Sequence, residues 1–179
     1  EVAQVLGIGP DQVRIIPSAV GGGFGGKLDC SVQPLLAVAA WILEKPIRCT
    51  FTRPESLASS TKRHPAKMKA CASCDKDGTL TSLSFEGDFN TGAYASWGPT
   101  VADRVPIHCS GPYFVPNILA KTRALLTNGP PSGAFRGFGV PQSAIAHEAL
   151  MDSLAEQTGI DPLKFLSLIH ISEPTRPVV

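Results

Sequence analysis

The most regular alternation of apolar and polar residues lies in the middle of the chain, on both sides of a polar turn. Residues 67–74 and 80–89 each place an apolar or small side chain at every second position. The four residues at 75–78 have the composition of a tight turn. Because side chains alternate between the faces of a strand, we predict an antiparallel hairpin with one buried face. The residues expected on that face are Met68, Ala70, Ala72, Cys74, Leu83, Phe85, Gly87 and Phe89.

Helical spacing of apolar residues is clearest near the C-terminus. Residues 140–157 are predicted to form a helix that ends at Gly159, and Pro162 is placed to begin another. His147 lies on the apolar face of the first helix, where a core histidine is a simpler interpretation than a metal ligand. The residues that share this face are Val140, Ala144, His147, Met151 and Leu154.

Weaker patterns predict the remaining elements. An apolar helix is expected after Ser31, which could be its N-cap, with Pro34 in its first turn. Its apolar residues cover most of its circumference, so burial on several sides is expected. The other predictions are helices at residues 1–6 and 101–107, and strands at 13–16, 47–53 and 119–127. Together these elements predict an α+β fold.

Composition and charge exclude several classes of partner. The chain has 179 residues, of which 43% are hydrophobic, which suits about one domain with a core. A formal charge of +1 gives no long-range attraction for nucleic acid or for an anionic membrane. No apolar run approaches the roughly 20 residues of a membrane span. We expect neither partner, and the start at Glu1 without a methionine suggests a piece of a longer protein.

The cysteines indicate a reducing environment. Their number is five and they are scattered, which favours the cytoplasm over a secreted disulfide framework. Cys71 and Cys74 form a C-x-x-C sequence, but on a strand their thiols point to opposite faces. No second pair accompanies them, so we assign them no metal or redox role.

A glycine-rich segment from Gly21 to Lys27 holds five glycines around Phe24, and such bare backbone lets a ligand approach closely. A dinucleotide-binding signature is weak here, because the acid expected about 20 residues later is only Glu44. A phosphate loop would need Ser or Thr where Leu28 stands. A third interpretation directs the backbone amides at a cofactor oxygen, with Phe24 as a wall. A glycine turn without a ligand is the structural alternative.

A second glycine loop, from Gly129 to Gly139, repeats this chemistry. It contains Phe135, Arg136 and Phe138 among small residues, and it leads directly into the helix predicted from residue 140. Free amides at a helix N-terminus beside a cation suit an anionic or oxygen-rich ligand.

Together the two loops resemble the molybdenum-cofactor-binding part of the xanthine dehydrogenase and aldehyde oxidase family. Either loop alone is weak evidence, but both in this order and at this spacing are specific. The resemblance extends from Glu1 to Phe165, includes Arg104 and the segment 63–65, and covers a minority of the family's large molybdenum subunit. The matching motifs are Gly21-Gly22-Gly23-Phe24-Gly25-Gly26-Lys27 and Gly133-Ala134-Phe135-Arg136-Gly137-Phe138-Gly139-Val140-Pro141-Gln142.

This resemblance implies a set of cofactor-binding residues. The backbone of Phe24 and Gly25 would lie beside the apical molybdenum ligand. Phe135 and Arg136 would approach the metal and the pterin from the other side. The full set is Gly23, Phe24, Gly25, Gly26, Ala134, Phe135 and Arg136, with Phe24, Gly25 and Arg136 nearest to the metal.

The resemblance also implies how substrate is bound. Phe138 would stack on the substrate ring, and Arg104 would bind a substrate carbonyl oxygen as charge builds up in the transition state. An ion pair of Arg104 with Asp103 or with a distant acid is the structural alternative. The chain departs from the purine-oxidising members at Leu28, where they have a Glu that helps to hold the purine. A leucine cannot accept a hydrogen bond, so xanthine is a less suitable substrate than another N-heterocycle or an aldehyde.

The implied activity is hydroxylation of an N-heterocycle or aldehyde at a C–H bond with water-derived oxygen. The cofactor would be molybdenum-molybdopterin, with or without a cytosine-dinucleotide extension, and it would supply the redox chemistry. Iron-sulfur clusters and FAD are expected on other domains or subunits of a dimeric complex. A Gln near the metal and a general-base Glu would lie outside this chain, so we expect it to be inactive alone. The alternative is a nucleotide-binding module that uses the first loop, which would leave the second loop without a role.

The end of the chain departs from the family pattern. Residues 1–165 are interpreted as a partial cofactor-binding domain. Residues 166–179 are similar to a translated sequencing adapter, and we expect them to be a non-native or disordered tail without functional residues.

Overall fold

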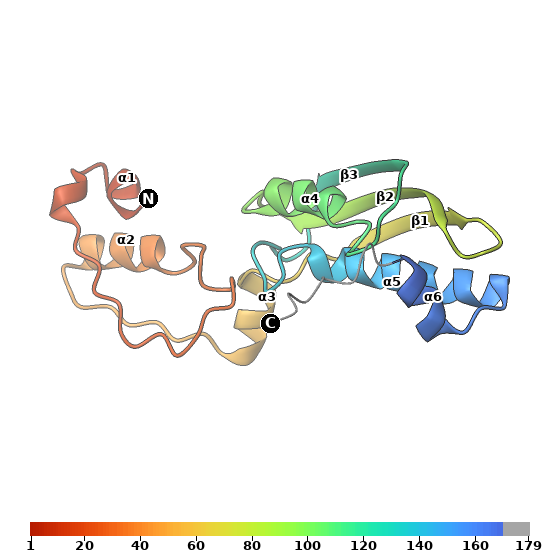
Figure 1. Ribbon diagram of the computed structural model, residues 1–179. Coiled ribbons are helices and arrows are strands. Elements are labelled where there is room, and N and C mark those ends of the chain that lie inside the picture. The colour runs from red at the N-terminus through yellow and green to blue at the C-terminus, as the bar shows by residue number, and fades with distance from the viewer. Residues whose placement is uncertain (170–179) are drawn as a thin grey trace, which may run out of the picture.

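The structure is a computed structural model that describes residues 1–169 (Figure 1). Helices and strands are intermixed, which confirms the α+β class. In chain order the elements are α1 (Val2–Leu6), the 3₁₀ helix η1 (Pro10–Gln12), α2 (Gln33–Leu43), α3 (Arg53–Ser59), β1 (Ala66–Cys74), β2 (Leu80–Gly92), α4 (Gly98–Ile107), β3 (Ile118–Leu126), α5 (Val140–Thr158) and α6 (Pro162–Ile169).

The strands form one mixed sheet in the order β1-β2-β3. β1 and β2 are antiparallel, and the Gly78 amide closes their turn by donating to the Asp75 carbonyl at 3.0 Å, which confirms the predicted hairpin. β3 runs parallel to β2. A parallel pair needs a crossover connection, and α4 lies within it.

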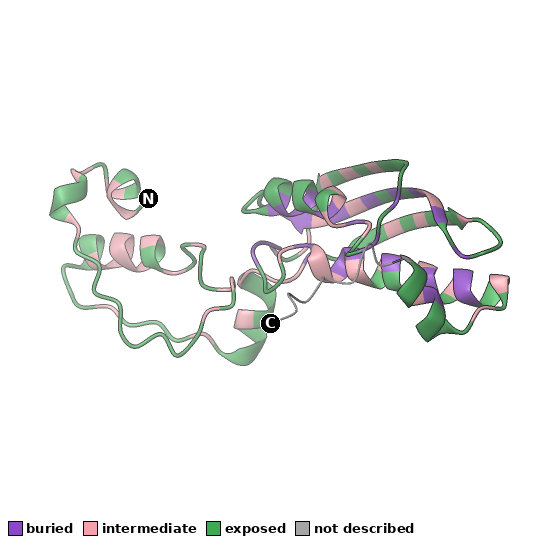
Figure 2. Cartoon of the chain, viewed as in Figure 1, coloured by how far each residue is buried: buried purple, intermediate pink, exposed green. Residues whose placement is uncertain are grey.

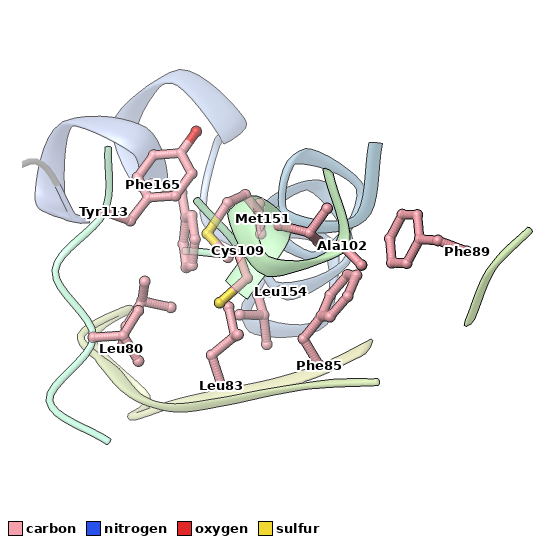
Figure 3. Packing of buried hydrophobic residues seen from close by; sticks show 13 residues of the cluster. Leu80, Leu83, Phe85, Phe89, Ala102, Cys109, Tyr113, Met151, Leu154 and Phe165 are labelled. Atoms are coloured by element: carbon pink, nitrogen blue, oxygen red, sulfur yellow. The ribbon is translucent and has the colours of Figure 1, made fainter. Parts of the chain in front are cut away.

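One face of the sheet is covered by helices. α4 packs on β2 and β3, and α5 packs on β1. Phe85 and Phe89 of β2 are buried among these helices, together with Met151 of α5 (Figure 3). The alternating pattern placed the inward face of β2 correctly, because Ser84 and Glu86, on either side of Phe85, are exposed. On that outer face Asp88 pairs with Arg123 of β3 at 2.7 Å.

The C-terminal helices follow the prediction closely. α5 ends at Gly159, whose left-handed φ of 69° a glycine adopts without strain. His147 is buried on the inner face of α5, as a core histidine should be. Its ring packs edge-on against Tyr113, with 6.0 Å between the ring centroids, and its Nε2 lies 3.3 Å from Glu148 Oε1.

The first third of the chain is open by comparison. No residue before His64 is buried, and Figure 2 shows the buried positions gathered around the sheet and α5. The prediction that α2 is buried on several sides is wrong for the described residues. Leu35 and Ile42 are each 71% exposed, and α1 is the element that packs on this helix.

Three local predictions in this region are also wrong. Residues 13–16 and 47–53 are not strands, since neither segment has a neighbouring strand with which to pair. The first glycine loop, which the predicted strand at 13–16 and the predicted helix after Ser31 would have placed between a strand and a helix, is therefore not preceded by a strand. Ser31 does not cap α2, whose N-cap is Val32 without a side-chain hydrogen bond, although Pro34 does lie in its first turn.

The helix α3 was not predicted from the sequence. Thr52 is its N-cap and forms a capping box with Glu55, whose carboxylate accepts from the Thr52 amide at 2.7 Å. The sequence Thr52-Arg53-Pro54-Glu55 is a known start signal for a helix, and it outweighs the apolar residues before it.

Two further expectations concern the whole chain. Within residues 1–169 no helix has both the length and the hydropathy that crossing a bilayer requires. The predicted boundary at residue 165 stays a prediction. α6 continues to Ile169, and the rest of the predicted tail, residues 170–179, lies outside the described residues.

Candidate functional site

The first glycine loop is a compact turn that presents Phe24. The Gly26 amide donates to the Gly23 carbonyl at 2.9 Å, and Lys27 Nζ donates to the Val20 carbonyl at 2.7 Å. Phe24 has a left-handed φ of 49° and is 66% exposed. A left-handed conformation costs a residue with a Cβ roughly 1–2 kcal/mol. The Lys27 ammonium is thus hydrogen-bonded within its own part of the chain, whereas the lysine of a phosphate-binding loop would be directed at the ligand.

The second loop presents its aromatic residue in the same conformation. Phe138 has a φ of 50°, and its amide donates to the Phe135 carbonyl at 2.7 Å. The adjacent Gly139 has a φ of 97° and approaches α4 so closely that a Cβ on it would lie 2.9 Å from the Val101 carbonyl oxygen. The loop is therefore pressed against α4 immediately before α5 begins.

The two loops touch each other. A Cβ on Gly25 would lie 2.9 Å from the carbonyl carbon and oxygen of Ala134 and 3.0 Å from the Phe135 nitrogen. The guanidinium carbon of Arg136 lies 5.8 Å from the centroid of the Phe24 ring, within the range of a cation–π contact. The structure thus joins residues that the sequence separates by more than 100 positions.

Several backbone donors at this junction are unpaired. Within residues 1–169 the amides of Phe24, Gly25, Ala134, Phe135 and Arg136 donate no hydrogen bond. Backbone amides in tight loops are suited to binding oxygen-rich ligands. The same residue range contains no group of three or more His, Cys, Asp or Glu side chains that could hold a metal ion.

A polar contact joins the first loop to the turn before α4. The Ser96 hydroxyl lies 2.9 Å from both carboxylate oxygens of Asp29, and a Cβ on Gly133 would lie 3.1 Å from Asp29 Oδ2. Asp29 directly follows Leu28, whose side chain is 60% exposed. Sequence reasoning did not identify Asp29 or Ser96, because no periodicity indicates a contact over 67 positions.

Two candidate substrate residues are associated with α4. Phe138 packs edge-on against Trp97, the N-cap of α4, with 6.2 Å between ring centroids. Arg104 lies in the last turn of α4, is exposed, and forms no ion pair with Asp103 or any other residue of the described part. The structure does not show a direct contact of Arg104 with Phe138 or Leu28. Trp97 is an addition to the predicted site.

The segment before β1 lies under the second loop. His64 is buried, and burial lowers the pKa of its imidazole below 6.5. Its Nε2 has no hydrogen-bond partner in the described part of the chain. The His64 carbonyl accepts from Gln142 Nε2 at 3.1 Å, which ties this segment to the first turn of α5.

The site geometry agrees with a match to a known family. Residues 1–167 match the molybdopterin cofactor-binding domain. The chain belongs to this family. The match confirms the resemblance on which the sequence analysis relied and the expectation of a molybdopterin cofactor.

Curated relatives place this molybdopterin cofactor-binding domain in larger proteins. The chain is 47% identical to the "Nicotinate dehydrogenase large molybdopterin subunit" of Eubacterium barkeri over 91% of its own length and 38% of the relative. It is 38% identical to a probable xanthine dehydrogenase subunit of Bacillus subtilis strain 168, over 92% of its length and 22% of the relative. The chain therefore spans less than half of each of these proteins.

A solved structure supports the fold of the domain. The aldehyde oxidoreductase from Desulfovibrio gigas matches with a TM-score of 0.90 and 32% identity, over 97% of this chain and 19% of that one. The nucleotide-binding alternative finds no support in these comparisons. Lys27 also argues against it, since its ammonium is bonded to the Val20 carbonyl.

The residues at the loop junction fit the cofactor of this family. Gly25 lets the backbones of the two loops approach closely, and the amides of Phe24, Gly25, Ala134, Phe135 and Arg136 donate no hydrogen bond within residues 1–169. The roles predicted for individual residues, including Arg104, Phe138 and Leu28, stay predictions.

Proposed function

We propose that the intact protein is a molybdopterin-dependent oxidoreductase that hydroxylates an N-heterocycle or an aldehyde at a C–H bond, with oxygen derived from water. The observation that supports this most is the contact of Gly25 with the backbone of Ala134 and Phe135, which brings unpaired amides of both loops to one place. The names of the relatives from Eubacterium barkeri and Bacillus subtilis describe dehydrogenases, which supports the same reaction class.

In this proposal the loops bind the cofactor mainly through backbone. The amides of Phe24, Gly25 and Phe135 would donate to its oxygen atoms, and Arg136 would place positive charge beside them. Gly23 and Gly26 shape the turn that presents these donors. When bound, the molybdenum cofactor would supply the redox chemistry. Because the donors are already held in position, little reorganisation would accompany charge development.

Three side chains would position the substrate. The Phe138 ring, fixed in its turn and supported by Trp97, would stack on a planar substrate. Arg104 is free of ion pairs in the described residues, so its guanidinium is available for a substrate carbonyl or carboxylate. Leu28 would form an apolar edge of the pocket.

This combination favours a small aromatic heterocycle that is polar on one side only. Nicotinate, which the name of the 47% identical relative specifies, is a pyridine with one carboxylate, and Arg104 would be a suitable counter-charge. Xanthine is polar around its whole edge and would leave groups unpaired against Leu28.

We further propose that electrons leave through iron-sulfur clusters and FAD on partner domains or subunits. The complex would be a dimer located in the cytoplasm. The word "subunit" in the names of two relatives supports an assembly of several chains.

Purification of the intact protein with its partners tests the proposal. We expect molybdenum and molybdopterin in a fixed ratio to protein. In water labelled with oxygen-18, the hydroxylated product of nicotinate or of an aromatic aldehyde should contain the label. Unlabelled product, or protein without molybdenum, would refute the proposed function.

A further inference from the structure

A short strap, residues 62–64, lies beneath the second loop, and its central residue Arg63 contacts that loop twice. Arg63 Nη2 donates to the Arg136 carbonyl oxygen at 2.6 Å. Its guanidinium carbon also lies 4.6 Å from the centroid of the Phe135 ring. One side chain therefore holds the backbone of one loop residue and the ring of the residue before it.

The strap is itself fixed on both sides of Arg63. The Lys62 amide donates to the Pro131 carbonyl at 3.1 Å, and the Gly133 amide donates to the Lys62 carbonyl at 3.0 Å. On the other side the His64 carbonyl accepts from Gln142 Nε2 at 3.1 Å. Because its neighbours are bonded to the loop and to α5, the backbone of Arg63 has little freedom to move relative to its target.

Two cation–π contacts in succession connect the strap to the first loop. Arg63 lies over Phe135, and Arg136 lies over Phe24. Phe135 and Arg136 are adjacent in sequence and exposed, and their amides have no partner in the described residues. Without Arg63, no side chain of that part of the chain would bond the Arg136 carbonyl. The orientation of the amides next to it would then be less restricted.

We propose that Arg63 is a positioning residue of the cofactor site, which sets the Phe135–Arg136 backbone so that its amides can bind the molybdenum cofactor. This inference rests on the proposed function. It assigns Arg63 no contact with cofactor or substrate. A planar guanidinium can donate a directed hydrogen bond and stack on a ring at the same time, whereas an ammonium cannot do both in the same geometry. Lysine should therefore be a poor replacement.

The test compares Arg63→Lys and Arg63→Gln with Arg48→Lys and Arg48→Gln in the intact protein. Arg48 is exposed and makes no hydrogen bond or ion pair within residues 1–169, so it is a matched control. We expect both Arg63 variants to reload cofactor at least about tenfold more weakly than wild type, equivalent to about 1.4 kcal/mol. The melting temperature of the cofactor-free protein should match that of the Arg48 variants.

A second readout does not need the cofactor. The carbonyl that Arg63 holds belongs to the peptide bond that trypsin cleaves after Arg136. We expect faster tryptic cleavage at this bond in cofactor-free Arg63→Gln than in cofactor-free Arg48→Gln. Equal cleavage and equal cofactor affinity would overturn the inference. A parallel loss of melting temperature and affinity would also overturn it, since that indicates a general structural role. A wild type that never holds molybdenum would instead overturn the proposed function, and this inference with it.

Discussion

Gly25 and Ala134 lie so close that a Cβ on Gly25 would be 2.9 Å from the carbonyl carbon and oxygen of Ala134. Gly25 also has a φ of 91°, a conformation that residues with a side chain rarely adopt. A glycine is thus required here for two reasons, which are the positive φ of residue 25 and the closeness of the Ala134 backbone. Since Ala134 is 1% exposed, its backbone has little space into which it could move away.

Gly25→Ala should therefore separate the loops and weaken cofactor binding. Backbone strain of this kind costs about 1–3 kcal/mol, enough to reduce affinity by about tenfold or more. Molybdenum content per purified protein is the measurement. Gly21→Ala is a matched control, since Gly21 has a similar requirement for positive φ, at 65°, but no atom within 4 Å of its Cβ position. Full cofactor content in Gly25→Ala would show that the first loop does not bind the cofactor.

Arg104→Ala should lower kcat more than it raises KM. The guanidinium is proposed to act on charge that appears in the transition state, and removal of such a donor typically costs about 10²–10³-fold in kcat. Arg104 has no ion pair in the described residues, so its loss leaves no unpaired carboxylate there, and stability should change by no more than about 0.5 kcal/mol.

Steady-state kinetics of the intact enzyme measure both effects. Asp103→Asn is the control, because Asp103 is the exposed neighbour on the same helix turn. It should leave kcat unchanged. An effect of Arg104→Ala on KM alone would exclude the proposed role.

His64 should make stability depend on pH. Burial lowers the pKa of its imidazole below 6.5, so the folded state disfavours the proton that the unfolded chain binds. As the pH falls below about 6.5, the unfolded state gains a proton first, and the free energy of unfolding decreases until the folded pKa is reached. Melting temperatures of wild type and His64→Gln measure this effect over a range of about pH 5 to 8, which brackets the ordinary pKa of histidine. The difference between the two proteins should change with pH only below about 6.5, and a constant difference would contradict the prediction.

The sequence predicted the fold best where an element contains its own signals. The β1–β2 hairpin has alternation and a turn within 27 consecutive residues, from Ala66 to Gly92, and α5 has its periodicity and its terminal Gly159. Segment 47–53 was mistaken for a strand because its apolar residues Ile47, Cys49 and Phe51 alternate with polar ones, and alternation does not show whether a neighbouring strand is present to pair with. The capping box at Thr52 was the local signal that could have corrected this.

In the site, too, features with a local sequence signal were predictable and long-range contacts were not. The glycine loops were recognisable because their residue types are unusual, and their role as two halves of one site followed from the family resemblance. The contacts that fix them were not recognisable. The Asp29–Ser96 and Arg63–Arg136 contacts span 67 and 73 positions, and nothing near either residue indicates its partner. The partners of these residues are seen only in the folded structure, where the loops pack against α4 and the strap.

The last prediction concerns Leu28 and the choice of substrate. Its side chain is 60% exposed at the end of the first loop, and Asp29 next to it is held by Ser96, so the backbone at this position is anchored while the side chain is free to meet a substrate. We expect wild-type enzyme to prefer a less polar N-heterocycle or an aromatic aldehyde over xanthine. Leu28→Glu should shift the ratio of kcat/KM values towards xanthine by about 10–100-fold, since full burial of a leucine is worth about 1.5–3 kcal/mol.

Kinetics with both substrates on both forms decide the matter, with Leu28→Met as the control that keeps the apolar surface and similar volume. A pocket edge that forms hydrogen bonds strongly rejects a ligand that lacks the matching group. An apolar edge rejects a polar ligand more weakly, because the cost comes only from those ligand groups that are left without a hydrogen bond. Leu28→Glu should therefore reduce the rate with the apolar substrate as well as raise it with xanthine. Wild-type preference for xanthine without any gain in Leu28→Glu would show that this position does not contact the substrate.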